Sequence, residues 1–444
     1  MVTPPPHPPG RAVPSGRLSR LARFGGMAAG IGAGMVAEGA RRLADGERPS
    51  LDDLILTPAN ARRVTDQLAN LRGAAMKLGQ MLSLDAGDFL PRELSDILAR
   101  LRSEAQHMPP AQLLKVLDRH WGKGWRLRFQ RFEPRAFAAA SIGQVHRATL
   151  PDGTKLALKV QYPGVKASID SDVDNVATLL RVSRLLPSSL DIVPLLAEAK
   201  RQLHDEADYA REAEYLQRFG RLLADDGDFL VPAVHADLSG ADVLAMTFIE
   251  GRPIESLTDA PQAERDRVVR LLCALTLREL FEFGVMQTDP NFANYRYQPE
   301  DGADNGRIVL LDFGAARDIP DGLRDGYRRL FAATLTGDVD AVRDAALANG
   351  MIGTAAVSRH RGAVDTMIAA VLAPFAAEGA FDFGAPEFVA TMRERGLTIA
   401  ADRAAWHTPA ADLLFVQRKL GGVYLLASRL KARVDIRQLL RQYF

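Results

Sequence analysis

The 444-residue sequence has almost no cysteine, no excess of charge of either sign and no long hydrophobic run. Its single cysteine, Cys273, excludes a disulfide framework and any zinc or iron–sulfur site built from several thiolates. The 56 Lys and Arg residues balance 55 Asp and Glu residues, which excludes a globally basic nucleic-acid-binding protein. No stretch of about 18 charge-free apolar residues is present, so we expect no ordinary membrane-spanning helix. The composition, 47% hydrophobic and 25% charged, is typical of a globular protein, and the length allows two or three domains or one large two-lobed domain.

The N-terminal segment differs in composition from the rest of the chain. Residues 1–17 are rich in proline, and we expect a disordered tail there. Arginines but no acidic residue precede Glu38, and glycines recur every four residues from Gly26 to Gly34. This spacing lets two helices approach closely, so residues 18–48 are predicted to form a membrane-surface or dimer-forming helix. A helix packed on its own chain and a cleaved transit peptide are the alternatives.

Hydrophobic patterning divides the remaining sequence into three parts. A helical pattern predicts an N-terminal helical extension over residues 49–124. Apolar runs on either side of the turn sequence Pro151-Asp-Gly153 indicate strands, and predict a mixed lobe over residues 125–251. The pattern after Arg252 is mostly helical, apart from a short apolar strand over residues 307–311, and predicts a larger helical lobe over residues 252–444.

An alanine-rich loop is the first of four motifs that are typical of nucleotide phosphoryl chemistry. It occupies the G-x-G-x-x-G-x-V frame of a kinase loop that covers phosphates, but it keeps only the third glycine. The methyl groups of the alanines limit a close approach to phosphate. A plain alanine-rich hairpin is therefore the alternative. The candidate nucleotide-binding residues of this loop are Ala138, Ala139, Ala140, Ser141, Gly143 and Val145.

A strand lysine is the second motif. The sequence Leu156-Ala-Leu-Lys159 matches the V-A-I-K pattern, in which the lysine is a point charge for the α- and β-phosphates of a nucleotide. Such a lysine needs a carboxylate partner, and one expected helix offers Glu206, Asp208 and Glu212. Glu212 is the preferred partner, while Glu206 remains open. A solvated lysine on an edge strand is the alternative.

Two acidic motifs complete the set. Asp289 and Asn294 keep the D-x-x-x-x-N spacing of a kinase catalytic loop, although Asx-capped turns use the same residue types. Asp312-Phe-Gly314 follows an apolar strand, where a carboxylate is a suitable oxygen ligand for Mg²⁺. The four motifs occur in the order that kinase-like nucleotide binding requires. We therefore predict Asp289 and Lys159 as catalytic residues and Asn294 and Asp312 as metal ligands.

Several of these motifs resemble those of the UbiB family, the ADCK-type atypical kinase-like proteins of coenzyme Q biosynthesis. The resemblance covers about residues 18–444 and is closest to the mitochondrial branch. It is carried by Lys77-Leu-Gly79-Gln80, Ala138-Ala-Ala-Ser141, Glu206-Ala-Asp208, Gln287-Thr-Asp289-Pro-Asn291, Leu311-Asp-Phe-Gly-Ala315 and Arg418-Lys-Leu-Gly-Gly422. It implies an α+β, protein-kinase-like two-lobed fold with an N-terminal helical extension. It also implies that Lys77 and Gln80 face the nucleotide, near Glu206 and Asp208.

The resemblance further implies an ATPase that uses ATP and Mg²⁺ and supports ubiquinone biosynthesis. The implied partners are an anionic membrane surface, isoprenoid-quinone lipids and ubiquinone-biosynthesis proteins, with a possible homodimer and no nucleic acid. The expected location is cytoplasmic and peripheral on the inner membrane in a bacterium, or the matrix side in a mitochondrion. The short charged segment that follows Asp312, residues 317–328, contains no A-P-E motif, which argues against protein phosphorylation. A nucleotide-gated lipid-binding scaffold and a small-molecule kinase of the aminoglycoside- or choline-kinase type are the alternatives.

Overall fold

The chain forms two compact units, each of which is described by itself. The first unit holds residues 1–214 and 233–248, and the second holds residues 215–232 and 249–444. The predicted segments 1–17 and 18–48, most of the predicted extension and Gln80 lie outside the described residues. The computed structural model describes residues 73–75, 77, 108–182, 193–299, 306–376, 379–385, 387–405, 407 and 409–444.

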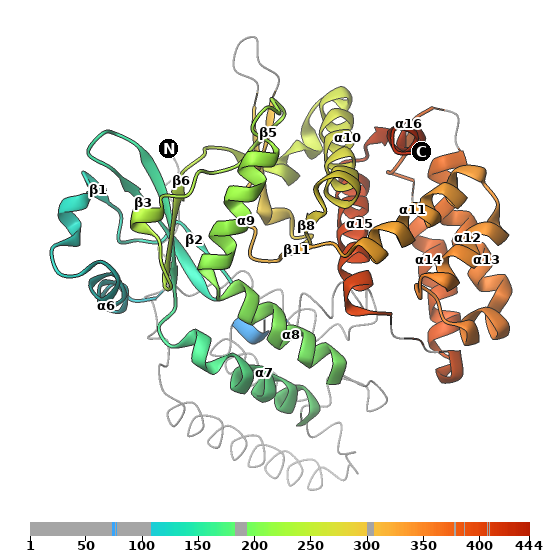
Figure 1. Cartoon of the computed structure of the whole chain (residues 1–444), viewed down its shortest axis with the longest axis horizontal. Coiled ribbons are helices and arrows are strands. Elements are labelled where there is room, and N and C mark those ends of the chain that lie inside the picture. Colours follow the sequence, from blue (N-terminus) through green and yellow to red (C-terminus); the bar gives the residue numbers. More distant parts are fainter. Residues whose placement is uncertain are drawn as a thin grey trace, which may run out of the picture. The chain divides into compact units, whose positions relative to one another are not determined.

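An antiparallel sheet forms the centre of the first unit (Figure 1). The predicted turn at residues 151–153 joins its two longest strands, and Gly153 takes a φ of +90° that suits glycine. One core packs sheet residues such as Leu156 and Leu158 against α6 (Pro110–Trp121) and Trp125. The strands are β1 (Arg131–Phe132), β2 (Ala138–Ala139), β3 (Gly143–Thr149), β4 (Lys155–Gln161) and β6 (Val243–Thr247), in the order β1-β3-β4-β6 with β2 on β3.

Three helices follow β4 along the chain. They are α7 (Val165–Val182), α8 (Val193–Glu206) and α9 (Tyr209–Leu222), and α7 packs beside α8 (Figure 1). The sequence pattern predicted a single helix that carries both Glu206 and Glu212, and that prediction is wrong. The chain leaves α8 at Glu206, and α9 begins three residues later because Asp208 bonds to the first turn of the new helix.

Short strands form the sheets of the second unit. The predicted apolar strand is confirmed as β10, which runs parallel to β5 and antiparallel to β9. A separate antiparallel pair, β8 with β11, brings the residues before Asp289 next to those after Asp312. The strands are β5 (Phe229–Leu230), β7 (Arg252–Pro253), β8 (Val285–Gln287), β9 (Tyr295–Gln298), β10 (Arg307–Leu310) and β11 (Ala316–Asp318), with β12 (Phe381–Asp382) paired to β13 (Arg433–Val434).

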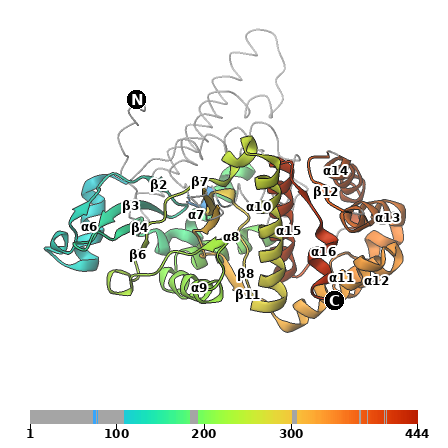
Figure 2. The ribbon, with the colours of Figure 1, turned by 90° about the horizontal axis from the view of Figure 1, so that it is seen from above.

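Helices make up most of the second unit. Helix α10 (Gln262–Arg278) lies beside α15 (Ala411–Arg429) in both ribbon views (Figures 1 and 2). Cys273 in α10 is half-buried, and desolvation raises the pKa of its thiol to about 12. Among the described helices, none combines the length and the hydropathy needed to cross a bilayer. The others are α11 (Asp321–Thr336), α12 (Val339–Ala348), α13 (Thr354–Ala376), α14 (Glu387–Ala400) and α16 (Ile436–Arg441).

Candidate functional site

The alanine-rich loop is a tight hairpin in the first unit. Ala140 N donates to Gly143 O over 2.9 Å and closes the turn. A Cβ atom on Gly143 would lie 2.5 Å from Val160 O, so the neighbouring strand leaves no space for a side chain there. All the predicted loop residues lie within this hairpin: Ala138, Ala139, Ala140, Ser141, Gly143 and Val145, with Ala138 paired to Val145.

Lys159 and Glu212 form a buried ion pair. Lys159 lies opposite Val145 on β4, and its Nζ donates to both carboxylate oxygens of Glu212 over 2.8 Å. The two side chains are 8% and 2% exposed. The Tyr209 ring lies 5.4 Å from the ammonium and adds a cation–π contact. Of the two glutamates left open by the sequence, the structure therefore joins Glu212 to the strand lysine.

Glu206 instead joins Lys77 to the alanine-rich loop. Its carboxylate accepts from Lys77 Nζ at 2.5 Å and from Ser141 Oγ at 2.7 Å. Residues 73–75 and 77 are helical, and a Cβ atom on Gly73 would lie 2.9 Å from Ser141 O. Because Gly73 and Lys77 are four residues apart, one helix face contacts both the loop and Glu206. Lys77 itself is 1% exposed.

Asp208 has a local structural contact. Its carboxylate accepts from Arg211 N over 3.2 Å, and its carbonyl accepts from Glu212 N over 3.0 Å. These bonds satisfy backbone donors in the first turn of α9, which carries Glu212. The structure thus brings Lys77, Glu206 and Ser141 into one group and Lys159 and Glu212 into another, while Asp208 fixes the start of α9.

The predicted catalytic loop lies in the second unit, between β8 and β9. Asn294 Nδ2 donates to Asp289 Oδ2 over 3.0 Å, so the two ends of the D-x-x-x-x-N motif contact each other. Asn291 caps the short 3₁₀ turn Phe292–Asn294 by accepting from Ala293 N over 3.1 Å. The Asx-capped turn proposed as an alternative is therefore present, together with the contact between the two motif residues.

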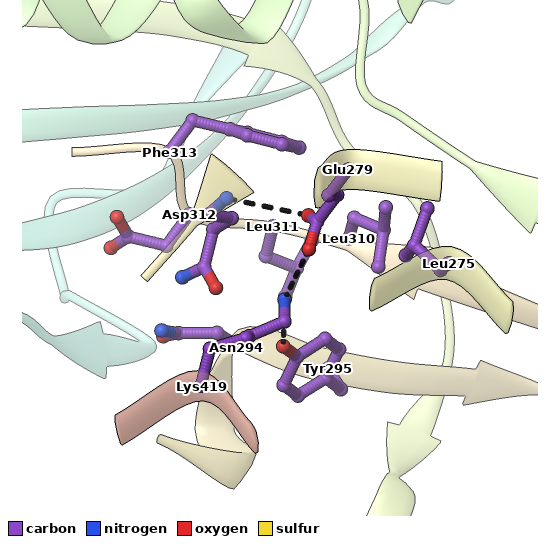
Figure 3. A pocket seen from close by; sticks show the side chains of 10 residues that line it. Leu275, Glu279, Asn294, Tyr295, Leu310, Leu311, Asp312, Phe313 and Lys419 are labelled. Atoms are coloured by element: carbon purple, nitrogen blue, oxygen red, sulfur yellow. Dashed lines mark hydrogen bonds and ion pairs between the residues drawn. The ribbon is translucent and has the colours of Figure 1, made fainter. Parts of the chain in front are cut away.

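Asp312 follows β10 and is held close to this loop. Its Oδ1 atom accepts from Gly314 N over 2.9 Å. The preceding residue, Leu311, donates its N–H to Asn294 O over 3.0 Å. Asn294 and Asp312 both line one small cavity (Figure 3). The second unit therefore brings together all three predicted residues of the catalytic and metal motifs.

The chemistry of this cavity fits Mg²⁺. Asn294 commits its amide nitrogen to Asp289, which leaves the amide oxygen as a ligand beside the Asp312 carboxylate. Mg²⁺ prefers hard oxygen ligands and is commonly held by one or two side chains together with water and substrate phosphates. Within the described ranges, no group of three or more His, Cys, Asp and Glu side chains could hold a metal by itself. These residues therefore suit a metal ion whose remaining ligands are supplied by a phosphate group and water.

The sequence motifs did not reveal a buried polar cluster beneath the catalytic loop. Lys419 Nζ lies 3.0 Å from Glu279 Oε2 and 3.2 Å from Tyr295 Oη, between the two side chains in Figure 3. Burial is the largest single effect and lowers the pKa of Lys419, but Glu279 and Tyr295 together outweigh it and raise that pKa above its ordinary value. Lys419 lies in the Arg418–Gly422 motif, which was the only sequence signal for this cluster.

Comparison with known proteins gives concordant matches. Residues 100–346, more than half of the chain, match the ABC1 atypical kinase-like domain. Rat "Atypical kinase COQ8B, mitochondrial" is 40% identical over 440 residues, which cover 98% of this chain and 81% of the rat protein. "Atypical kinase COQ8, mitochondrial" of Saccharomyces cerevisiae is 37% identical and covers 98% of this chain and 86% of its own. A solved structure of Rv3197 with erythromycin, from Mycobacterium tuberculosis, aligns with a TM-score of 0.61 and 27% identity over 87% of this chain and 96% of that one. The expected kinase-like fold is confirmed.

Proposed function

The chain belongs to the ABC1 atypical kinase-like family, which includes the UbiB and ADCK proteins, and from this premise we propose that it binds ATP with Mg²⁺ and hydrolyses it. The observation that carries the proposal is the contact of Asp289 with Asn294 beside Asp312. Phosphoryl transfer needs a residue that orients the attacking oxygen and ligands that hold the metal. These three side chains supply both.

Each residue has a distinct part in the proposed reaction. Lys159 places a positive charge against the α- and β-phosphates, and Glu212 holds its ammonium in place. Mg²⁺, when bound by Asn294 and Asp312, would neutralise charge on the phosphates. Asp289 orients the attacking water and accepts its proton. Asn294 also fixes the carboxylate of Asp289 through its amide nitrogen.

Two features favour hydrolysis over transfer to a protein substrate. Glu206 holds Lys77 close to Ser141 of the alanine-rich loop, where kinases cover the nucleotide. Helix α11 begins at Asp321, soon after Asp312, and leaves little chain for an activation segment that could bind a protein. Water is therefore the proposed acceptor.

Steady-state hydrolysis tests this function. We expect purified protein to release phosphate from ATP in the presence of Mg²⁺. Asp289→Asn should lower kcat at least a hundredfold while ATP binding is kept, and Asp312→Asn should weaken the Mg²⁺-dependent part of binding. Asp321→Asn, at an exposed carboxylate in the same unit, is the control and should match the wild type. Normal turnover by Asp289→Asn would contradict the role given to Asp289.

The same assay separates the alternatives. A phosphorylated small alcohol, in place of free phosphate, would indicate a small-molecule kinase. ATP binding without hydrolysis under any lipid condition would indicate a nucleotide-gated scaffold.

The biological role proposed for this activity is support of ubiquinone biosynthesis, together with isoprenoid-quinone lipids and the proteins of that pathway. The support for it is the extended similarity to proteins named COQ8 and the shared motifs. A strain that lacks its own protein of this family tests the role. We expect the wild type to restore quinone production and Asp289→Asn not to. Restoration by Asp289→Asn would favour the scaffold.

We further propose that the protein contacts an anionic membrane surface. The described residues include an exposed basic segment around the short 3₁₀ helix Trp125–Arg128. At its tip Leu127 is 90% exposed between two arginines, while Trp125 is buried and donates its indole N–H to Asp118 over 2.9 Å. A fixed apolar tip among cations fits a lipid interface, where each cation contributes roughly 1 kcal/mol. The cations are Lys115, Arg119, Lys123, Arg126, Arg128, Arg131 and Arg135.

Vesicle cosedimentation tests the membrane proposal. The triple variant Arg126→Gln, Leu127→Ser, Arg128→Gln should bind vesicles with 30% phosphatidylglycerol at least tenfold more weakly than the wild type. Leu397→Ser, at an exposed leucine of the second unit, should bind as the wild type does. Deletion of residues 1–40 measures how much the N-terminal segment contributes to vesicle binding. Equal binding by the triple variant would remove this surface from the proposal.

A further inference from the structure

We infer that helix α15 positions the catalytic loop, and that Lys419 and Gly422 are its positioning residues; the inference rests on the proposed function, because it concerns the placement of Asp289 and Asn294. Three residues of α15 contact segments that carry the catalytic and metal motifs: Phe415, Lys419 and Gly422. They are spaced at i, i+4 and i+7, so they lie on one face of the helix. This face of α15 therefore supports the catalytic loop.

The first contact ties both ends of the loop to one ion pair. Lys419 Nζ donates to Tyr295 Oη over 3.2 Å, and Tyr295 directly follows Asn294. The other end is held by Glu279, whose Oε1 atom accepts from Gln287 N over 3.3 Å. Gln287 lies two residues before Asp289. The Lys419–Glu279 pair, at 3.0 Å, therefore fixes the span of the loop that contains both motif residues (Figure 3).

The second contact supports the middle of the loop. A Cβ atom on Gly422 would lie 2.0 Å from Pro290 Cβ and 3.1 Å from Pro290 Cα. Pro290 directly follows Asp289, so the backbone of α15 is in direct contact with the catalytic turn. The neighbouring Gly421 has no atom within 4 Å of the corresponding position. Only the second glycine of the pair is required by this contact.

The third contact reaches the segment after the metal motif. The Arg317 guanidinium lies 3.7 Å from the centre of the Phe415 ring. Arg317 is in β11, which pairs with β8, and Thr288 Oγ1 donates to Ala315 O over 2.7 Å. These bonds join the segment after Asp312 to the segment before Asp289, and Phe415 places both against the same helix.

Stability alone does not account for the buried ion pair. Glu279 and Lys419 are 1% and 2% exposed, and the desolvation of two buried charges can cancel their attraction. A pair of apolar side chains would fill the same volume without that cost. The charges instead supply directional bonds to Gln287 N and Tyr295 Oη, which apolar groups cannot make. Glu279 also opens a π-helical turn, Glu279–Phe283, a rare geometry often found at functional sites.

The glycine pair gives the sharpest test. Gly421→Ala and Gly422→Ala both gain the helix propensity of alanine, but only Gly422→Ala collides with Pro290. We expect Gly422→Ala to lower kcat at least tenfold and to raise the Mg²⁺ concentration needed for half-maximal rate. Its binding of ATP without Mg²⁺ should stay within twofold of the wild type. Gly421→Ala should match the wild type in all three measurements.

Hydrogen–deuterium exchange gives a second reading that does not depend on turnover. Peptides covering residues 285–298 should exchange at least tenfold faster in Gly422→Ala and at the wild-type rate in Gly421→Ala. If the wild type hydrolyses no ATP, the proposed function fails, and this exchange still decides the inference. Unchanged exchange in Gly422→Ala would overturn it.

A double variant tests the ion pair. Lys419→Met alone can fail to fold because it leaves Glu279 buried without its counter-ion, so it is combined with Glu279→Met. The melting temperature of the double variant should be close to that of the wild type. Its kcat should still be at least tenfold lower, and residues 285–298 should still exchange fast. Arg343→Met with Asp365→Leu removes another ion pair of the second unit, at 2.6 Å, and should leave kcat unchanged. Recovery of both stability and kcat in the first double variant would show that the pair is only structural.

Discussion

At the scale of single residues, each buried lysine near the candidate site forms an ion pair with its own glutamate. Lys77 pairs with Glu206, Lys159 with Glu212, and the pair beneath the catalytic loop is formed in the same way. The V-A-I-K pattern predicted Lys159, because the motif is local. Its partner stayed open between two glutamates, because the break between α8 and α9 is set by Asp208 and by packing.

The Lys159–Glu212 pair leads to a stability prediction. Glu212→Ala would leave the Lys159 ammonium buried without a carboxylate, and breaking a buried pair in this way costs about 3–5 kcal/mol. Urea denaturation should show a loss of unfolding free energy of that size. Glu214→Ala, at an exposed glutamate of the same helix, should change it by less than about 0.5 kcal/mol. Equal losses in the two variants would contradict this account.

At the scale of elements, local sequence signals were sufficient to predict several strands but not to predict which face of a helix contacts the site. The hairpin of β3 and β4 could be predicted because a Pro-Asp-Gly turn separates two apolar runs, and β10 because it is short and apolar. The face of α15 could not, because Gly421 and Gly422 look alike in sequence and only the contact with Pro290 distinguishes them. Contacts between segments more than a hundred residues apart leave no periodic signal.

The bend in α13 gives a pH prediction. Asp402 accepts from Arg359 Nε over 2.6 Å and from His360 Nε2 over 2.9 Å, where the backbone of α13 departs from helical geometry. Bonds from Arg359 and then His360 lower the pKa of Asp402 to about 2. Because the pKa is lower in the folded protein than its ordinary value of 3.8, the ionised carboxylate stabilises the fold at pH values above 3.8. This contribution to stability is lost as the pH falls toward 2.

Melting temperatures measured from pH 5 to pH 2.5 check this expectation. The wild type should lose more stability over that range than Asp402→Asn, which has no carboxylate to titrate. Parallel curves for the two proteins would show that the ionisation of Asp402 does not contribute.

At the scale of the whole molecule, each compact unit is built from segments that are not continuous along the chain. The sequence pattern set the boundary at residue 251, whereas compactness assigns residues 215–232 to the second unit and returns residues 233–248 to the first. The reason is pairing: β5 joins the sheet of β10, and β6 joins the sheet of β4. Strand partners are chosen by tertiary contacts, which hydrophobic patterning along the chain does not report.

The even charge balance gives a prediction for solubility. With a net charge of +1 and a sequence isoelectric point near 7.9, electrostatic repulsion between molecules is weakest close to pH 8. The protein should precipitate at the lowest polyethylene glycol concentration near that pH, and at higher concentrations at pH 6 and pH 9.5. A solubility minimum below pH 6 would contradict the estimate from composition.

The single cysteine has a practical consequence for measuring motion. Cys273 is only partly exposed and desolvation raises the pKa of its thiol, so little of it is thiolate at pH 8 and maleimide or methanethiosulfonate reagents should modify it slowly. The natural chain should therefore add little background labelling when a spectroscopic probe is attached to an introduced cysteine. Cysteines introduced at the exposed positions Leu127 and Leu397, one in each unit, could carry spin labels, and the distance between the labels could be measured with and without ATP.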